Sequence, residues 1–152
     1  MTFEISDIFL AKPLDTPLYH GFERLLAEIF DPEAPENMRR RVAMQKNALL
    51  LIAHEKGAVL GFKLGFEEDA ETYYSWLGGV APTARKRGIA SSLMKAQHDW
   101  CCKNGYSFIT TRTENRYRDM LLLNIKHGFE ISGTFVGKRG ELKIMLTKKL
   151  LS

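Results

Sequence analysis

The spacing of hydrophobic residues changes several times along the chain, and each change predicts a new element. Between residues 17 and 30, apolar side chains recur at every third or fourth position, which predicts an amphipathic helix. The same spacing returns after Pro82 and predicts a long helix that begins near Gly88 and ends near Gly105. Asn37 is the predicted N-cap of a shorter helix that reaches about residue 46, and residues 119–127 are predicted to form the last helix.

Short apolar stretches between polar turns predict the strands of one sheet. They lie at residues 3–10, 48–54, 58–66, 72–80, 106–113, 129–136 and 142–146. The predicted order is therefore β-α-α-β-β-β-α-β-α-β-β, an α/β (α+β) chain with a mixed sheet and helices on its faces. The chain contains no repeat, low-complexity tract or flexible linker, so residues 1–152 are predicted to form a single domain.

Composition narrows the classes of protein that fit. The chain has 45% hydrophobic and 26% charged residues, which is typical of a globular protein. A net charge of +4 favours an anionic ligand but is too weak to indicate nucleic acid by itself. The adjacent Cys101 and Cys102 and four scattered histidines offer no metal-ligand spacing, so no metal is predicted. An acidic N-terminus without a long apolar run predicts a cytoplasmic protein that is not bound to a membrane.

Three cations, Arg85, Lys86 and Arg87, stand directly before Gly88, between a predicted strand and a predicted helix. The first N–H groups of a helix lack internal partners and carry the positive end of its dipole. A glycine at this point lets an anion approach the backbone closely. The segment therefore predicts a pyrophosphate-binding loop. Neither G-x-x-x-x-G-K-[ST] nor G-x-G-x-x-G occurs, and the remaining alternative is a solvated basic turn before an ordinary helix.

The same segment carries a resemblance to a known family. Arg85-Lys86-Arg87-Gly88-Ile89-Ala90 resembles the [QR]-x-x-G-x-[GA] loop of the GNAT superfamily of N-acetyltransferases. Residues 77–82 resemble the fourth strand of that family and its exit, and residues 124–129, which end in Gly-Phe, resemble the end of its next conserved helix. The order of elements also matches, so the resemblance covers nearly the whole chain. It implies the GNAT-like acyl-CoA N-acyltransferase fold, with a mostly antiparallel central sheet.

The resemblance also implies acetyl-CoA as co-substrate and a set of residues that bind it. Backbone N–H groups from Arg87 to Ser91 would hold the pyrophosphate, and the backbone of Gly78 and Val80 would pair with the pantetheine arm like an extra strand. Alternatively, the pair Gly78-Gly79 marks a bulge or a close approach within the strand. The implied cofactor-binding residues are Gly78, Val80, Arg85, Lys86, Arg87, Gly88, Ile89, Ala90, Ser91 and Asn124.

The catalytic residues are less well defined, because the chain departs from the family twice. Asn124 stands where many relatives have a tyrosine acid, and Tyr74 stands where many have a glutamate base. Asn124 either hydrogen-bonds the cofactor or is a polar residue on a helix surface. The N–H of Val80 is the implied oxyanion donor. Tyr117 and Tyr74 are the other catalytic candidates, although both also fit packing roles.

Asn115 lies shortly before the last predicted helix. We predict that it caps this helix, although contact with pantetheine is an alternative.

The predicted function is an acetyl-CoA-dependent N-acetyltransferase in which the primary amine of a small molecule or peptide attacks the thioester directly. The two departures motivate an alternative, a non-catalytic acyl-CoA-binding sensor or interaction domain. Nucleic-acid binding through Arg112, Arg116 and Arg118 is a third, weaker alternative, and no nucleic-acid partner is predicted. Acidic loop residues such as Glu68 fit a cationic acceptor, for example a polyamine or a lysine side chain. The family resemblance also allows a homodimer.

Overall fold

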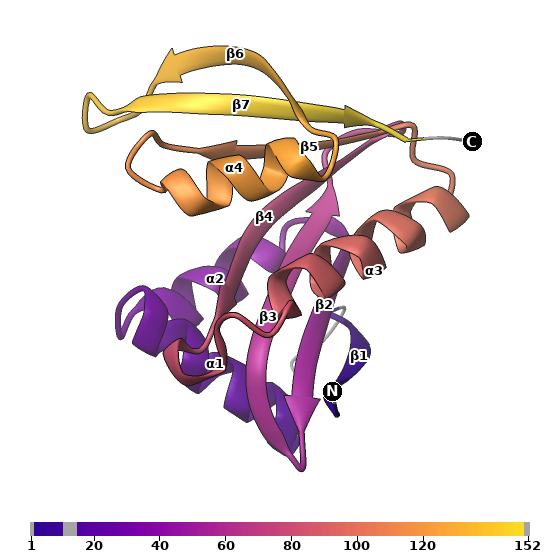
Figure 1. Ribbon diagram of the computed structural model, residues 1–152, viewed down its shortest axis with the longest axis vertical. Helices are drawn as coiled ribbons and strands as arrows, with labels where there is room; N and C mark the ends of the chain where they lie inside the picture. The colour runs from indigo at the N-terminus through magenta and orange to yellow at the C-terminus, as the bar shows by residue number, and fades with distance from the viewer. Residues whose placement is uncertain (1, 11–14, 151–152) are drawn as a thin grey trace.

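Seven strands form one sheet in the order β1-β2-β3-β4-β5-β7-β6 (Figure 1). The computed structural model describes residues 2–10 and 15–150. The strands are β1 (Glu4–Phe9), β2 (Lys46–Glu55), β3 (Ala58–Glu67), β4 (Thr72–Val80), β5 (Phe108–Thr113), β6 (Glu130–Val136) and β7 (Leu142–Lys149). All neighbours are antiparallel except β4 and β5, which are parallel. The predicted mixed, mostly antiparallel sheet is therefore confirmed.

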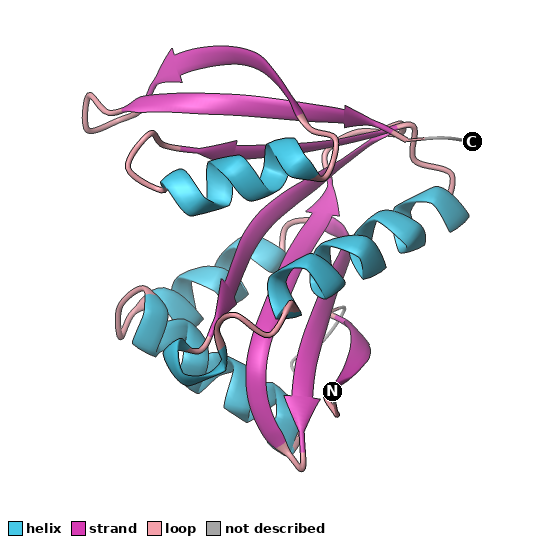
Figure 2. Cartoon of the chain, viewed as in Figure 1, coloured by secondary structure: helices cyan, strands magenta, loops and turns pink. Residues whose placement is uncertain are grey.

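Helices cover both faces of this sheet (Figure 2). They are α1 (Pro17–Ile29), α2 (Ala34–Val42), a short 3-10 helix η1 (Pro82–Ala84), α3 (Ile89–Lys103) and α4 (Arg118–Lys126). Side chains of α1 and α2 pack in one hydrophobic core, and those of α3 and α4 in the core on the opposite face. The predicted order of elements is therefore confirmed. Within the described residues, no helix has both the length and the apolar character needed to cross a bilayer.

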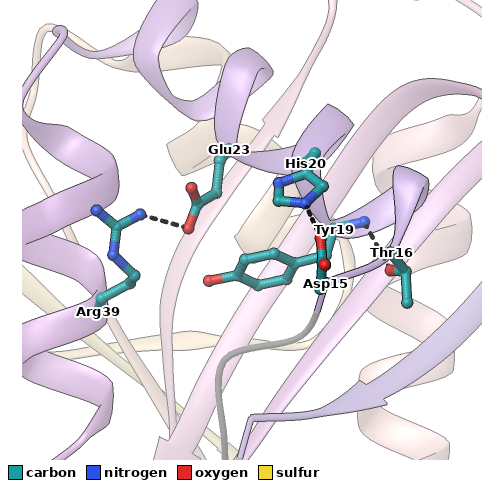
Figure 3. Close-up of polar contacts among 6 residues, drawn as sticks. All are labelled: Asp15, Thr16, Tyr19, His20, Glu23 and Arg39. Carbon is teal, nitrogen blue, oxygen red and sulfur yellow. Dashed lines mark hydrogen bonds and ion pairs between the residues drawn. The ribbon is translucent and has the colours of Figure 1, made fainter.

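The first two helices are fixed to each other by polar contacts (Figure 3). The hydroxyl oxygen of Thr16 accepts a hydrogen bond from the backbone N–H of Tyr19 at 3.3 Å, which caps the N-terminus of α1. The guanidinium of Arg39 on α2 pairs with the carboxylate of Glu23 on α1 at 2.6 Å. This ion pair bridges the two helices at the surface of their shared core.

Two predicted helix caps are wrong. The backbone N–H of Asn37 already bonds to the carbonyl of Glu33 at 3.1 Å, because α2 begins at Ala34 with a proline in its first turn. The helix ends at Val42 because the chain turns there into β2, which begins at Lys46. At the start of α4, the N-cap residue is Tyr117 and no side chain caps the helix, so Asn115 does not have the predicted role.

The parallel strands β4 and β5 part soon after they meet. They pair only from Thr72↔Phe108 to Ser75↔Thr111. Beyond that point β5 continues along β7, while β4 continues along β3, and Figure 1 shows the two strands diverging. Among the described residues, none pairs with positions 76–80 of β4 on the side that faces β5. The sheet therefore opens into a wedge, and we call the Ser75↔Thr111 pair the apex of this wedge.

A β-bulge lies at the apex, two residues before the glycine pair where the sequence indicated one. The register with β3 changes from Leu64↔Leu77 to Gly65↔Ser75, which leaves Trp76 as the extra residue. Gly78 and Gly79 stay in register, so a bulge at that pair is wrong. Gly79 instead allows a close approach, because a Cβ there would lie 2.7 Å from Cδ1 of Ile29 on α1.

Candidate active site

The loop before α3 is shaped to present backbone N–H groups to an anion. Gly88 is the N-cap of α3 with φ 76° and ψ 14°, a left-handed conformation that favours glycine. Among the described residues, none has an atom within 4 Å of the position that a Cβ on Gly88 would take, so the loop is open there. The first N–H bonded within the helix is that of Ser92, to the carbonyl of Gly88 at 3.0 Å. The preceding N–H groups therefore point out of the helix end.

A cavity of about 240 Å³ lies at this helix end, between the exit of β4, the loop, α3 and α4. It is lined by Val80, Ala84, Arg85, Lys86, Gly88, Ile89, Ala90, Ser91 and Leu123. Seven of the ten predicted cofactor-binding residues are in this lining, and Gly78, Arg87 and Asn124 are not. The contiguous residues of the loop thus line one side of the cavity and α4 lines the other, and the lining is both cationic and apolar.

Arg87 points away from the cavity. Its guanidinium pairs with the carboxylate of Glu55 on β2 at 3.1 Å and lies 6.0 Å from the centre of the Phe3 ring. The hydroxyl of Thr2 and then Arg87 hold the pKa of the Glu55 carboxyl below its usual range. The side chain of Arg87 therefore anchors the loop to β2, and only its backbone N–H is left for an anion.

The edge of β4 beyond the apex carries free backbone groups. The N–H of Ala81 donates to the carbonyl of Leu60 at 2.8 Å, so these two residues form a hydrogen-bonded pair. Hydrogen-bonded pairs alternate along an antiparallel ladder, and the next one is Phe62↔Gly79. The N–H and C=O groups of Gly78 and Val80 therefore point away from β3 and into the wedge. This is the arrangement that an extended ligand needs to pair with β4.

The end of α4 closes the wedge from the α3 side. Asn124 on α4 is only 3% exposed, so its interpretation as a surface residue is wrong. Its carbonyl accepts hydrogen bonds from the N–H groups of His127 and Phe129 at 3.1 and 3.0 Å. Within the described part of the chain, no hydrogen bond to its side-chain amide is found. His127 Nε2 lies 3.0 Å from the hydroxyl of Ser91, which joins the end of α4 to the first turn of α3.

The two candidate tyrosines lie in different environments. Tyr74 is 7% exposed, and burial raises the pKa of its hydroxyl, which stays protonated and can donate a hydrogen bond. Its ring lies 5.4 Å from that of Phe66 and 5.0 Å from the guanidinium of Arg112. Tyr117 is 49% exposed, beneath the guanidinium of Arg116, and lies outside the lining of the cavity. The structure does not bring the two hydroxyls to one point.

Lys63 on β3 is a polar residue of the site that the sequence analysis did not single out. It is 8% exposed and lies opposite Gly78, and a Cβ on Gly78 would be 3.4 Å from its Nζ. Burial lowers the pKa of its ammonium to about 8. The signal in the sequence was a lysine inside an apolar strand, since residues 60–66 are otherwise glycine or hydrophobic. Among the described residues, buried side-chain atoms without hydrogen-bond partners lie on this face at Ser75, Gln97 and His98.

Two of the three arginines considered for nucleic-acid binding, Arg112 and Arg116, are engaged with carboxylates. The guanidinium of Arg112 lies 3.7 Å from the carboxylate of Glu68, and that of Arg116 lies 3.1 Å from the carboxylate of Glu114. These pairs divide the cations among separate acidic partners, so a continuous basic stripe is not formed by them. Among the described residues, no group of three or more histidines, cysteines or carboxylates is arranged to hold a metal ion.

Comparison with known proteins identifies the family to which the chain belongs. The model of the acetyltransferase (GNAT) family matches residues 18–129, which is most of the chain. The protein therefore belongs to the GNAT family of acetyltransferases, and the resemblance and enzyme class inferred from its loop are confirmed.

A curated relative and two solved structures agree with this assignment. An uncharacterized N-acetyltransferase, YhfO, of Bacillus subtilis strain 168 is 24% identical over 125 residues, which cover 79% of this chain and 84% of the relative. The structure of aminoglycoside 6'-acetyltransferase type Ii superimposes with a TM-score of 0.82 at 16% identity, covering 98% of both chains. A GNAT acetyltransferase from Elizabethkingia anophelis with acetyl-CoA bound superimposes with a TM-score of 0.73 at 19% identity, covering 98% of this chain and 99% of its own. These two structures confirm the fold.

Proposed function

We propose that the protein is an acetyl-CoA-dependent N-acetyltransferase that moves an acetyl group to the primary amine of a small molecule or peptide in a ternary complex. The observation that carries this proposal is the free edge of β4. This edge runs from the loop at Gly88 to the apex of the wedge. Because β4 and β5 part there, a ligand can approach the apex from either face of the sheet. A similar fold with acetyl-CoA bound supports the same ligand here.

The residues present fit the proposed cofactor along its length. The N–H groups of Ile89, Ala90 and Ser91 and the side chains of Arg85 and Lys86 would hold the diphosphate. The backbone groups of Gly78 and the C=O of Val80 would pair with the amides of the pantetheine arm, as one strand pairs with another. Arg87 would contribute through its backbone N–H, and the buried amide of Asn124 would face the arm from α4.

When bound, acetyl-CoA supplies an acyl group that is already activated as a thioester. The chain would hold the acceptor amine against it, which replaces a bimolecular encounter with a positioned one. The N–H of Val80 points into the wedge and would stabilise the oxyanion that develops on the acyl oxygen. Tyr74, whose raised pKa keeps its hydroxyl protonated and which directly precedes the apex pair Ser75↔Thr111, is our first tyrosine candidate for the acid. Tyr117, at the start of α4, is the second.

A non-catalytic acyl-CoA sensor is the alternative on the same fold. It is favoured by one observation: the amide of Asn124 is too weak an acid to give up a proton, at the position where a tyrosine acid is usual in this family. Calorimetric titration with acetyl-CoA tests the binding that both functions share, and absence of binding at high micromolar concentration would end both. Release of CoA thiol with any primary amine would then exclude the sensor, whereas binding without turnover across a broad amine panel would support it.

A further inference from the structure

Lys63 is a buried cation without a counter-charge. Among residues 2–10 and 15–150, no acceptor hydrogen-bonds its ammonium, and no carboxylate lies within ion-pair distance of it. A buried ammonium without partners is costly, and most such positions in proteins are occupied by apolar residues. The position opposite Gly78 is flanked by Phe62 and Leu64, so a hydrophobic residue would suit the strand. The charge therefore needs an explanation outside the stability of the fold.

The ammonium lies next to the free edge of β4. Lys63↔Gly78 is a non-hydrogen-bonded pair, in which opposing Cα atoms lie closest and side chains share one face. Since Gly78 has no side chain, the Lys63 amine occupies the space above it, on the face that α3 covers. The N–H and C=O of Gly78 point from the same position into the wedge. A chain extended along this edge thus passes beside the Lys63 ammonium.

The groups that face Lys63 from the other elements do not neutralise it. His98 on α3 has a pKa lowered to about 3 by burial and by the charges of Lys148 and Lys63, so its ring is neutral. Its Nδ1 accepts a hydrogen bond from the ammonium of Lys148 on β7 at 2.9 Å. His127, after α4, also has a lowered pKa. The ionised groups around Lys63 are therefore cations, and their electrostatics favour an anionic ligand.

We propose that the Lys63 ammonium stabilises and protonates the thiolate sulfur of CoA when the acetyl group leaves it, the task for which Asn124 has no proton. The inference rests on the proposed function. In the transfer, the acceptor nitrogen forms a bond to the acetyl carbon, and the carbon–sulfur bond breaks. The sulfur takes a proton from Lys63 Nζ and becomes the thiol. The acceptor nitrogen gives up one proton to solvent, and the neutral Lys63 amine regains one from solvent.

The test is the pKa of the CoA thiol in its complex, which needs no acceptor and no turnover. The thiolate absorbs in the ultraviolet, so its formation is followed as the pH of the protein–CoA complex is raised. Because the pKa of Lys63 is about 8, its ammonium and the thiol titrate as a coupled pair. While the ammonium keeps its charge it favours the thiolate, so thiolate should begin to form at least about one pH unit lower than in free CoA. Lys63→Met keeps the length and apolar stem of the side chain without the charge, and it should return the thiol to the titration of free CoA. Lys95→Met, an exposed lysine of α3, is the matched control and should titrate as the wild type does.

A second readout separates loss of the proton donor from loss of packing. Lys63→Met should lose at least about tenfold in kcat with acetyl-CoA, while the affinity for CoA measured by calorimetry changes by less than about twofold. Identical thiol titration in the wild type and Lys63→Met would overturn the role of Lys63 while leaving the proposed function intact. Failure of CoA to bind the wild type would overturn both.

A separate cluster on the opposite face of β4 points to the class of acceptor. The rings of Phe66, Tyr74 and Trp76 form an aromatic wall, with centroids 5.4 Å apart for Phe66–Tyr74 and 5.8 Å apart for Phe66–Trp76. The guanidinium of Arg41, at the end of α2, lies 5.7 and 5.5 Å from the centres of the Phe66 and Trp76 rings. That of Arg112 lies 5.0 Å from Tyr74 and 5.4 Å from Phe135. The guanidinium groups of Arg41 and Arg112 therefore lie against one aromatic surface.

This surface stands at the apex of the wedge. Ser75↔Thr111 is the last pair of β4 and β5, so Trp76 and Arg112 are the first residues past it on each strand. The charges that act on the Tyr74 hydroxyl there are those of Arg112, Arg41, Glu68 and Lys143. Arg112 is paired with Glu68 at 3.7 Å and Lys143 with Glu114 at 2.8 Å, so Arg41 is the cation left to meet a ligand. Within the described residues, Arg41 has no carboxylate in ion-pair distance. An acceptor that reaches the apex from this face meets a positive, aromatic surface.

We infer that the acceptor carries an anionic group, such as a carboxylate, together with its amine and an apolar or aromatic body. This replaces the cationic acceptor that acidic loop residues such as Glu68 suggested, because Glu68 is occupied by Arg112 whereas the guanidinium of Arg41 pairs with no carboxylate among the described residues. The inference rests on the proposed function but not on Lys63. It requires only that the aromatic wall is the acceptor side of the wedge.

Matched amines that differ in one carboxylate provide the test. Binding of an aminomethylbenzoate and of benzylamine to the protein is compared by calorimetry with CoA present, and kcat/KM is compared where turnover occurs. The carboxylate should improve affinity and kcat/KM at least tenfold, and Arg41→Gln should remove most of that gain. Arg40→Gln, the exposed neighbour on α2 that pairs with Glu36, is the control and should keep it. Equal binding, tighter binding of benzylamine, or binding of neither would overturn the inference, while CoA binding reports separately on the proposed function.

Discussion

The two faces of β4 at the wedge present different kinds of functional group, mainly backbone groups on one face and side chains on the other. On the face toward α3 and α4, the functional groups are the free backbone of Gly78 and Val80, the amides of a helix end and one buried lysine. On the face toward α1 and α2, they are exposed side chains, Arg41 and Arg112, resting on an aromatic wall. On our proposal, a ligand shared by a whole family would be met by backbone, which a short contiguous motif can encode. A ligand particular to one protein would be met by side chains from separate elements.

The largest effect that would break this comparison is expected from a negative charge introduced at the helix end. Gly88→Glu combines a strained left-handed backbone with a carboxylate in the anion site, and we expect CoA affinity to fall by about 1000-fold, or about 4 kcal/mol. Gly105→Glu is the control, because Gly105 has a similar φ of 84° at the opposite end of α3. Calorimetry with CoA should separate the two variants. Equal affinities for CoA in the two would mean that the loop does not hold the diphosphate.

Burial of the charged Lys63 side chain should lower the free energy of unfolding by an amount that depends on pH. The pKa of Lys63 is about 8 in the fold against its ordinary 10.5, so below pH 8 both folded and unfolded chains hold the proton and the fold bears the burial of the charge. Between these values the unfolded chain binds more protons, and stability rises with pH. Lys63→Met should therefore be more stable than the wild type at pH 7 by up to about 3 kcal/mol, with a smaller gap above pH 10. Urea unfolding at the two pH values measures this, and a gap that does not change with pH would contradict it.

The sequence predicted the residues on the face of β4 toward α3 and α4 far better than those on the face toward α1 and α2. The loop at Gly88 is contiguous, so its residues could be read together, and the seven that line the cavity were among those expected. Lys63 was missed because its meaning depends on facing Gly78, which is a matter of register between two strands. The bulge at Trp76 is likewise set by the pairing of β3 with β4. Arg41 and Arg112 lie on elements that only the folded chain brings to one aromatic wall.

The α1–α2 pair offers a milder perturbation of the acceptor side. Glu23 and Arg39 pair at 2.6 Å across the two helices, with Arg39 on the same helix as Arg41. Since the pair is partly exposed, Arg39→Met should destabilise the fold by less than about 1 kcal/mol. We expect KM for the acceptor to rise two- to fivefold, by about the factor that a small shift of α2 implies, with CoA affinity unchanged. Steady-state kinetics and calorimetry on one preparation would show whether the two faces respond independently.

The smallest effect is expected for Arg87→Gln, and it distinguishes the two arginines that flank Lys86. Both are expected from the family resemblance to serve the cofactor, but Arg85 lines the cavity, whereas the side chain of Arg87 is paired with Glu55. Arg85→Gln should weaken CoA binding by about three- to tenfold, with a gentler dependence on salt than in the wild type, because one cation is lost from the anion site. Arg87→Gln should change CoA affinity by less than about twofold, since the backbone N–H remains and exposed ion pairs contribute little. Calorimetry at low and at physiological salt measures both. If Arg87→Gln proves the more damaging, the Glu55 pair positions the loop, and the cofactor face depends on a side-chain contact after all.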